Sequence, residues 1–139
     1  MAIWQISFNI VENKTYNSKD IVYWIKEPEN ADNITFLEKH DSWSSNIIQY
    51  GDLQSTCIEI SKENGRIVEL CVRLDLRTLS KDILNNVVEY IKGLDGYIYY
   101  QNEIIEPTFK NVVFMIKEST AYKFCKNPMS FIDELSKIK

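Results

Sequence analysis

The chain has 139 residues, the size of one ordinary domain, and is long enough to bury a sizeable hydrophobic core. Hydrophobic residues make up 45% of it and charged residues 26%, a balance that excludes an intrinsically disordered chain. The net charge of -4 argues against duplex nucleic acid as a partner, because phosphate binding depends on clusters of Lys and Arg. No apolar run approaches the ~18 residues of a membrane span, and no secretion signal opens the chain. We therefore expect a cytoplasmic protein that binds neither membranes nor nucleic acid.

The first predicted element is a half-buried strand. Apolar and polar residues alternate near the start of the chain, as they do in a strand with one covered face. The residues expected on the covered side are Trp4, Ile6, Phe8 and Ile10.

The stretch from residue 13 to residue 43 has a weaker pattern. Ser18 is a suitable cap for a short helix, which Pro28 should end. The apolar residues of Ile34–Leu37 fit a short strand and a helical turn equally well, so the sequence leaves both open.

Three strands are predicted to follow as a meander. They are Ile47–Tyr50, Ser55–Lys62 and Arg66–Leu76, and the last two form a hairpin around Glu63-Asn64-Gly65. A two-residue Asn64-Gly65 turn would pair Glu63 with Arg66 and place the aliphatic residues of the two strands on opposite faces. A three-residue loop with a left-handed Gly65 places them on one face, and we expect this register. It predicts the pairs Lys62–Arg66, Ile60–Val68, Glu59–Glu69, Ile58–Leu70 and Cys57–Cys71.

Helical periodicity begins after the meander. Ser80 should cap a helix that Gly93 ends. Residues Tyr97–Tyr100 and Glu103–Ile105 then predict a strand that is either bent or doubled back between its two parts.

The C-terminal third is predicted to be helical. A helix after Glu106-Pro107-Thr108 carries an apolar stripe, and Ser119 should cap a turn that continues through Phe124. Asn127-Pro128 is a strong signal for the start of a last helix. The stripe of the first of these helices contains Phe109, Val112, Val113 and Ile116.

This order of elements predicts an α+β fold. We expect a mainly antiparallel sheet, formed by the N-terminal strand, the central meander and one later strand, with helices packed on one face. The sequence contains neither an internal repeat nor a linker. Residues 1–139 are therefore expected to form a single domain.

No catalytic, metal-binding or cofactor-binding residues stand out. Cys57, Cys71 and Cys125 form no Cys-x-x-Cys pair, and His40 lies in no recognised nucleophile or metal motif. The glycines form neither a dinucleotide-binding nor a P-loop pattern. We expect reduced thiols, no cofactor and no enzymatic activity.

Charged residues on the outer side of the third meander strand are the most distinctive candidate site. Together with one acidic residue of the preceding strand, they predict a polar patch for a protein partner. An ordinary solvated sheet face, with arginines paired to Asp75, is the alternative interpretation. The candidate partner-binding residues are Glu59, Glu69, Arg73, Asp75 and Arg77.

Tyr97 and Tyr99 share one face of the later strand. Tyrosine is enriched in protein interfaces, but it is also a good strand former whose ring can cover a core. The sequence leaves both roles open.

Several short motifs together resemble a group of small bacterial α+β proteins, some of them from toxin-immunity loci. The motifs are Ser42-Trp43-Ser44 with Gly51, the strand Val72–Arg77, Glu106-Pro107, and a C-terminal pattern that runs from Ser119 through Ala121, Phe124 and Asn127-Pro128 to Phe131. The resemblance covers about the last 100 residues of the chain. It implies a bacterial cytosolic setting and supplies no site residues.

The resulting hypothesis is a non-enzymatic protein-binding domain, with an immunity-type inhibitor of a bacterial toxin as its specific form. An acidic protein is steered towards a basic partner, such as a basic toxin. The alternative hypothesis is a small-molecule-binding or regulatory domain with a pocket between sheet and helices.

Overall fold

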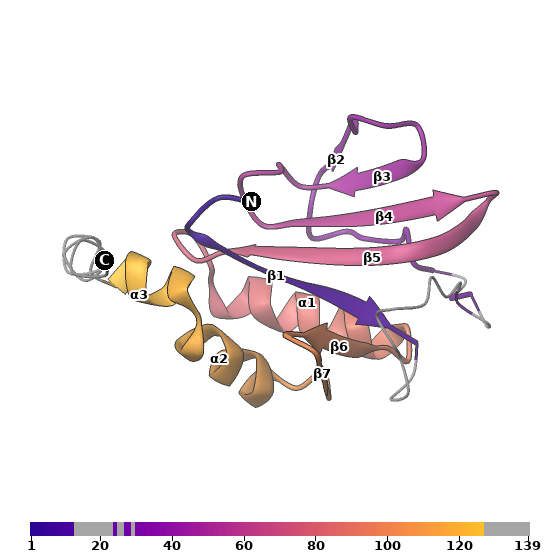
Figure 1. Cartoon of the computed structure of the whole chain (residues 1–139). Helices are drawn as coiled ribbons and strands as arrows, with labels where there is room; N and C mark the ends of the chain where they lie inside the picture. The colour runs from indigo at the N-terminus through magenta and orange to yellow at the C-terminus, as the bar shows by residue number, and fades with distance from the viewer. Residues whose placement is uncertain (13–23, 25–26, 29, 127–139) are drawn as a thin grey trace.

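The computed structural model describes residues 1–12, 24, 27–28 and 30–126 and shows an antiparallel sheet with helices packed against it (Figure 1). The strands are β1 (Gln5–Val11), β2 (Lys39–His40), β3 (Ile47–Tyr50), β4 (Cys57–Glu63), β5 (Arg66–Asp75), β6 (Tyr97–Tyr100) and β7 (Glu103–Ile105). The helices are α1 (Lys81–Gly93), α2 (Phe109–Glu118) and α3 (Thr120–Lys126). The predicted α+β class is confirmed.

The N-terminal strand lies inside the sheet. The seven described strands follow the order β2-β3-β4-β5-β1-β6-β7, and β1 pairs antiparallel with both β5 and β6. The first strand of the chain therefore joins the central meander to the later strands.

One face of the sheet, called the inner face here, is apolar and covered. Figure 1 shows α1 running alongside the sheet. Buried residues of α1, of α2 and of the segment before β2 form a single hydrophobic cluster with this face. The inner-face side chains that lie below 4% exposure are Ile6, Phe8 and Ile10 of β1, Ile58 and Ile60 of β4, Ile67, Leu70, Val72 and Leu74 of β5, and Ile98 of β6.

Trp4 does not belong to this face, although the alternating pattern placed it there. The strand begins one residue later, at Gln5, and Trp4 is only half-buried. Its indole Nε1 donates a hydrogen bond to the carbonyl of Gln54, 2.8 Å away. The prediction was correct for the other three residues of the pattern.

The register predicted for the β4–β5 hairpin was wrong. Its turn has two residues, Asn64 (φ 53°) and Gly65 (φ 76°), both left-handed, so that Glu63 pairs with Arg66. The ladder then shifts between Lys62 and Ser61, and Val68 is the extra residue of a bulge. Beyond the bulge the pairs are Ser61–Glu69, Ile60–Leu70, Glu59–Cys71, Ile58–Val72 and Cys57–Arg73.

The later strand is doubled back rather than continuous. β6 and β7 pair antiparallel across Gln101 (φ 49°) and Asn102 (φ 64°), which form a second left-handed two-residue turn. Of the two alternatives that the sequence left open for the later strand, the doubled-back form is the one observed.

The caps predicted at Ser80 and Ser119 are confirmed, whereas the predicted end of the first helix is not. Ser80 Oγ accepts from the Ile83 N–H at 3.1 Å and caps α1. Ser119 Oγ likewise accepts from the Tyr122 N–H at 3.1 Å, at the start of α3. Gly93, however, is still helical, and α1 ends through Leu94 and the left-handed Asp95.

Ile34–Leu37, for which the sequence left a strand and a helical turn open, is neither, and it follows a turn at Asn30–Asn33. Tyr50 and Tyr90 hold this turn, because their hydroxyls donate to the carbonyls of Asp32 and Ala31. The predicted helix after Ser18 and the one beginning at Asn127-Pro128 lie outside the described residues. No helix in the described part of the chain is long and apolar enough to cross a membrane.

Candidate functional site

The second face of the sheet, called the outer face here, is polar. It is built by the side chains that alternate with the aliphatic residues of the inner face. The strand pairings place one row of these residues directly across five strands: Gln49, Glu59, Cys71, Asn9 and Tyr99. The meander, the N-terminal strand and the later hairpin therefore contribute to one surface.

Glu59 and Arg73 form an ion pair at the centre of this face. Arg73 Nη2 lies 3.3 Å from Glu59 Oε1, and the arginine side chain is 26% exposed. Glu59 itself is buried. Its neighbour across the ladder is Cys71 and not the predicted Glu69, which lies opposite Ser61 and is exposed. The predicted contact between like charges is therefore absent from this hairpin.

Asp75 is fully buried and is held by Arg77. The guanidinium Nε and Nη2 donate to the two carboxylate oxygens at 3.0 Å each, and the Arg77 backbone N–H donates to Oδ1 at 2.9 Å. Burial alone would raise the pKa of Asp75, but these hydrogen bonds and the guanidinium charge lower it below its ordinary value. The carboxylate is therefore a fixed counterion for Arg77 and is inaccessible to a partner.

Arg77 is held from a second side by Trp4. The guanidinium carbon lies 3.9 Å from the centroid of the indole ring, a cation–π distance. The hydrogen bonds to Asp75 raise the already high pKa of Arg77, so its charge is permanent. About half of the side chain remains exposed at the end of the outer face.

The residues of the predicted patch thus fall into two groups, side chains that reach solvent and carboxylates that are buried beneath them. Glu69, Arg73 and Arg77 reach solvent, whereas Glu59 and Asp75 lie under the arginines that they neutralise. Sequence reasoning missed the contributions of other strands. The half-buried neighbours on the same face are Ser7 and Asn9 of β1 and Tyr97 and Tyr99 of β6.

The two thiols of the outer face are not poised for nucleophilic chemistry. Burial raises the pKa of Cys57 to about 12 and also raises that of Cys71, even though Ser7 Oγ lies 3.5 Å from the Cys71 sulfur. Both groups are protonated at neutral pH, and all three cysteines are free thiols. Cys57 lies opposite Arg73 and not opposite Cys71, as the corrected register requires.

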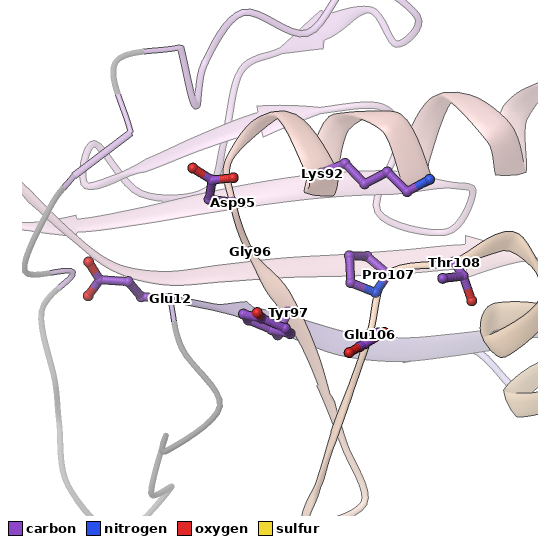
Figure 2. Close-up of a pocket in the computed structure, with 8 residues that line it drawn as sticks. All are labelled: Glu12, Lys92, Asp95, Gly96, Tyr97, Glu106, Pro107 and Thr108. Atoms are coloured by element: carbon purple, nitrogen blue, oxygen red, sulfur yellow. The ribbon is translucent and has the colours of Figure 1, made fainter.

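A second candidate site is a hollow of about 600 Å³ where sheet and helices meet (Figure 2). It lies between the end of β1, the C-terminal end of α1, the start of β6 and the residues before α2. Figure 2 shows Glu12 and Asp95 towards one end of it and Pro107 and Thr108 towards the other. Its lining residues are Glu12, Lys92, Asp95, Gly96, Tyr97, Glu106, Pro107 and Thr108.

The hollow is acidic. Three carboxylates line it against one cation, Lys92, whose Nζ also lies 3.6 Å from Glu89 Oε1 on the same helix. The C-terminal end of α1 adds its negative dipole to this side. No group of three Asp, Glu, His or Cys residues in the described ranges is arranged to hold a metal ion.

Comparisons of the chain with protein-family models, with curated proteins and with solved structures gave no match.

Proposed function

We propose that this chain is a non-enzymatic protein-binding domain whose outer sheet face meets its partner. The observation that carries the proposal is that Glu69, Arg73, Arg77 and Tyr99 share one face, on which the carboxylates beneath the two arginines are already neutralised. Arginine and tyrosine are the side chains that interfaces favour. Most of these groups stand on paired strands, and Arg77 is held by Asp75, so little conformational entropy is lost when a partner binds them.

The specific form of the proposal is an immunity-type inhibitor that neutralises a bacterial toxin in the cytoplasm. The resemblance of the Val72–Arg77 and Ser119–Phe131 motifs to proteins of toxin-immunity loci supports this form. The net charge of -4 would steer the domain towards a basic partner, while the mixed charges of the outer face would fix the orientation of the complex.

Affinity capture from a lysate of the source cell tests the proposal. Glu59 and Asp75 are buried counterions, so replacing them would test stability rather than binding. The informative variant is Glu69→Lys with Tyr99→Ala, which alters one exposed and one half-buried side chain of the outer face. We expect the wild type to retain a stoichiometric protein partner and this variant to lose it, with little change in thermal unfolding.

Glu89→Lys is the matched control, because it makes the same charge change at an exposed position on α1. It should retain the partner. Equal capture by the wild type, the outer-face variant and the control would reject the outer face as the binding surface.

The hollow beside α1 favours a second candidate function, small-molecule binding. Its volume of about 600 Å³ lies within the range of known ligand sites, roughly 300 to 1,000 Å³. Its lining is more charged than that of a typical ligand pocket, which is mostly apolar. Mass spectrometry of the captured sample distinguishes the two functions, because a retained metabolite without a protein partner would favour the hollow.

A further inference from the structure

Of the three tryptophans in the chain, Trp43 is the exposed one. Trp24 is buried in the hydrophobic cluster of the inner face, and Trp4 is held by Gln54 and Arg77. Trp43 is 73% exposed and lies outside that cluster, and its indole N–H has no hydrogen-bond partner among the described residues. Because its ring stays in water in the folded chain, Trp43 contributes little to the stability of the fold.

The loop that carries Trp43 has a defined backbone. Ser42 Oγ donates to the Ile47 carbonyl at 2.6 Å and accepts from the Ser44 N–H at 3.3 Å. Ser44 Oγ in turn accepts from the Asn46 N–H at 3.2 Å, and the Ser44 carbonyl accepts from the Ile47 N–H at 3.2 Å. The two serines beside Trp43 therefore hold the loop in one conformation, so little backbone entropy is lost when a partner binds it.

This loop lies at the rim of the outer face. It joins β2 to β3, and the N–H of Lys62 on β4 donates to the Asn46 carbonyl at 2.8 Å. The residue that follows the loop, Ile47, lies across from Ser61, which in turn lies across from Glu69. Since neighbouring strands are about 4.8 Å apart, Ile47 and Glu69 are separated by about 10 Å. A standard interface covers about 800 Å² of each protein, so a partner bound at Glu69 reaches this loop.

We propose that Trp43 is an anchor residue that inserts into an apolar pocket of the protein partner. The inference rests on the proposed function, because it concerns the same partner and extends the contact from the outer face to the β2–β3 loop. Tryptophan is one of the residues enriched among those that dominate binding free energies, and its contribution arises when a pocket removes the ring from water. The pocket should therefore be large enough for an indole ring and should offer a hydrogen-bond acceptor to its N–H.

Three single substitutions test this role with the partner that affinity capture identifies, after it has been purified and titrated by calorimetry. Trp43→Ala should weaken binding at least about 30-fold, as loss of a dominant interface residue does. Ser42→Ala keeps the indole ring but removes hydrogen bonds of the loop, and it should weaken binding by about three- to tenfold. Phe114→Ala is the matched control, because it removes an aromatic ring of similar exposure, 67%, from α2, and it should leave the affinity unchanged.

Fluorescence shows whether the indole ring itself is buried by the partner. When the complex forms, the tryptophan emission of the wild type should move to shorter wavelength and become less accessible to acrylamide. Most of this change should be absent from Trp43→Phe, which retains Trp4 and Trp24. Trp43→Ala and Phe114→Ala should unfold thermally like the wild type, because neither ring belongs to the core.

Two results would overturn the inference, and they differ in what they say of the proposed function. If Trp43→Ala binds the partner as tightly as Phe114→Ala, while Glu69→Lys with Tyr99→Ala has lost it, the outer face binds without the loop and the proposed function stands. If the wild type retains no stoichiometric partner, the proposed function fails and the inference fails with it. Loss of binding in Trp43→Ala, with binding intact in the outer-face variant, would support the anchor and reject the outer face.

Discussion

Asp75 shows how a fully buried carboxylate can remain ionised at neutral pH. Removal from water favours its protonated form, but Arg77 supplies two side-chain hydrogen bonds, one backbone hydrogen bond and a full positive charge. The hydrogen bonds outweigh the burial, and the pKa of Asp75 falls below its ordinary value. The role of this aspartate is therefore to fix the position of an arginine at the edge of the outer face.

The lowered pKa predicts how stability depends on pH. A group whose pKa is lower in the folded state stabilises the fold above its unfolded pKa, and this contribution is lost as the pH falls through the folded pKa. For Asp75 the loss begins near the ordinary Asp value of about 4 and continues below it. We expect Asp75→Asn to lower the free energy of unfolding at pH 7 by about 2 kcal/mol, because charge-assisted hydrogen bonds are replaced by weaker ones.

Urea unfolding at a series of pH values measures this difference. The gap between the wild type and Asp75→Asn should be constant above about pH 5 and should shrink towards pH 2. A gap that stays constant over the whole range would show that the charge of Asp75 contributes nothing to the fold.

Gly51 shows how a single residue can determine the backbone geometry of the connection from β3 to β4. Its φ of +84° is left-handed, and a Cβ at this position would meet the carbonyl oxygen of Thr56 at 2.2 Å. Because that oxygen belongs to the backbone, it cannot rotate away. We expect Gly51→Ala to destabilise the protein by more than about 3 kcal/mol, as measured by chemical denaturation.

Gly93 provides the matched control for this substitution. It lies in the last turn of α1 with ordinary helical geometry, and no heavy atom lies within 4 Å of its ideal Cβ. Gly93→Ala should therefore stabilise the protein by about 0.5 to 1 kcal/mol. Equal effects of the two substitutions would contradict the conformational argument.

The hairpin of β4 and β5 shows what the sequence could predict about a pair of strands and what it could not. The sequence predicted correctly that the aliphatic residues of the two strands share a face, and Ile58, Ile60 and Leu70 confirm it. It predicted the wrong turn, because a regular ladder was assumed on both sides of Gly65. The bulge at Val68 reconciles a two-residue turn with a common aliphatic face, since it shifts the alternation by one residue.

The hairpin of β6 and β7 lacked a strong local signal. Two-residue turns of this kind need left-handed residues, and glycine is the usual sign of them in a sequence. Here Gln101 and Asn102 adopt that geometry without glycine. The sequence therefore left a bent strand and a doubled-back strand equally open.

At the scale of the whole molecule, the sequence identified part of the candidate site and could not identify the rest. Glu69 and Arg73 alternate within β5 and Arg77 continues the same alternation just beyond it, so a single pattern revealed them. Asn9 and Tyr99 are separated from them in the chain and join the same face only because β1 lies between β5 and β6. That strand order depends on long-range pairing, which local periodicity does not encode.

The acidic hollow was missed for the same reason. Its carboxylates come from Glu12, Asp95 and Glu106, which lie in three different parts of the chain. Only Glu106 belongs to one of the motifs of the sequence, and that motif gave no sign of a site. They come together because α1 ends beside the end of β1 and because the hairpin of β6 and β7 leads back to α2.

The central claim is that the outer face of the sheet is the surface on which this protein meets its partner. Photo-crosslinking in the source cell tests it most directly, with benzoylphenylalanine placed singly at Glu69, at Tyr99 and at Glu89. We predict a covalent adduct with one protein from the first two positions, which lie on the outer face, and none from Glu89 on α1. An adduct from Glu89 together with none from Glu69 or Tyr99 would contradict the claim.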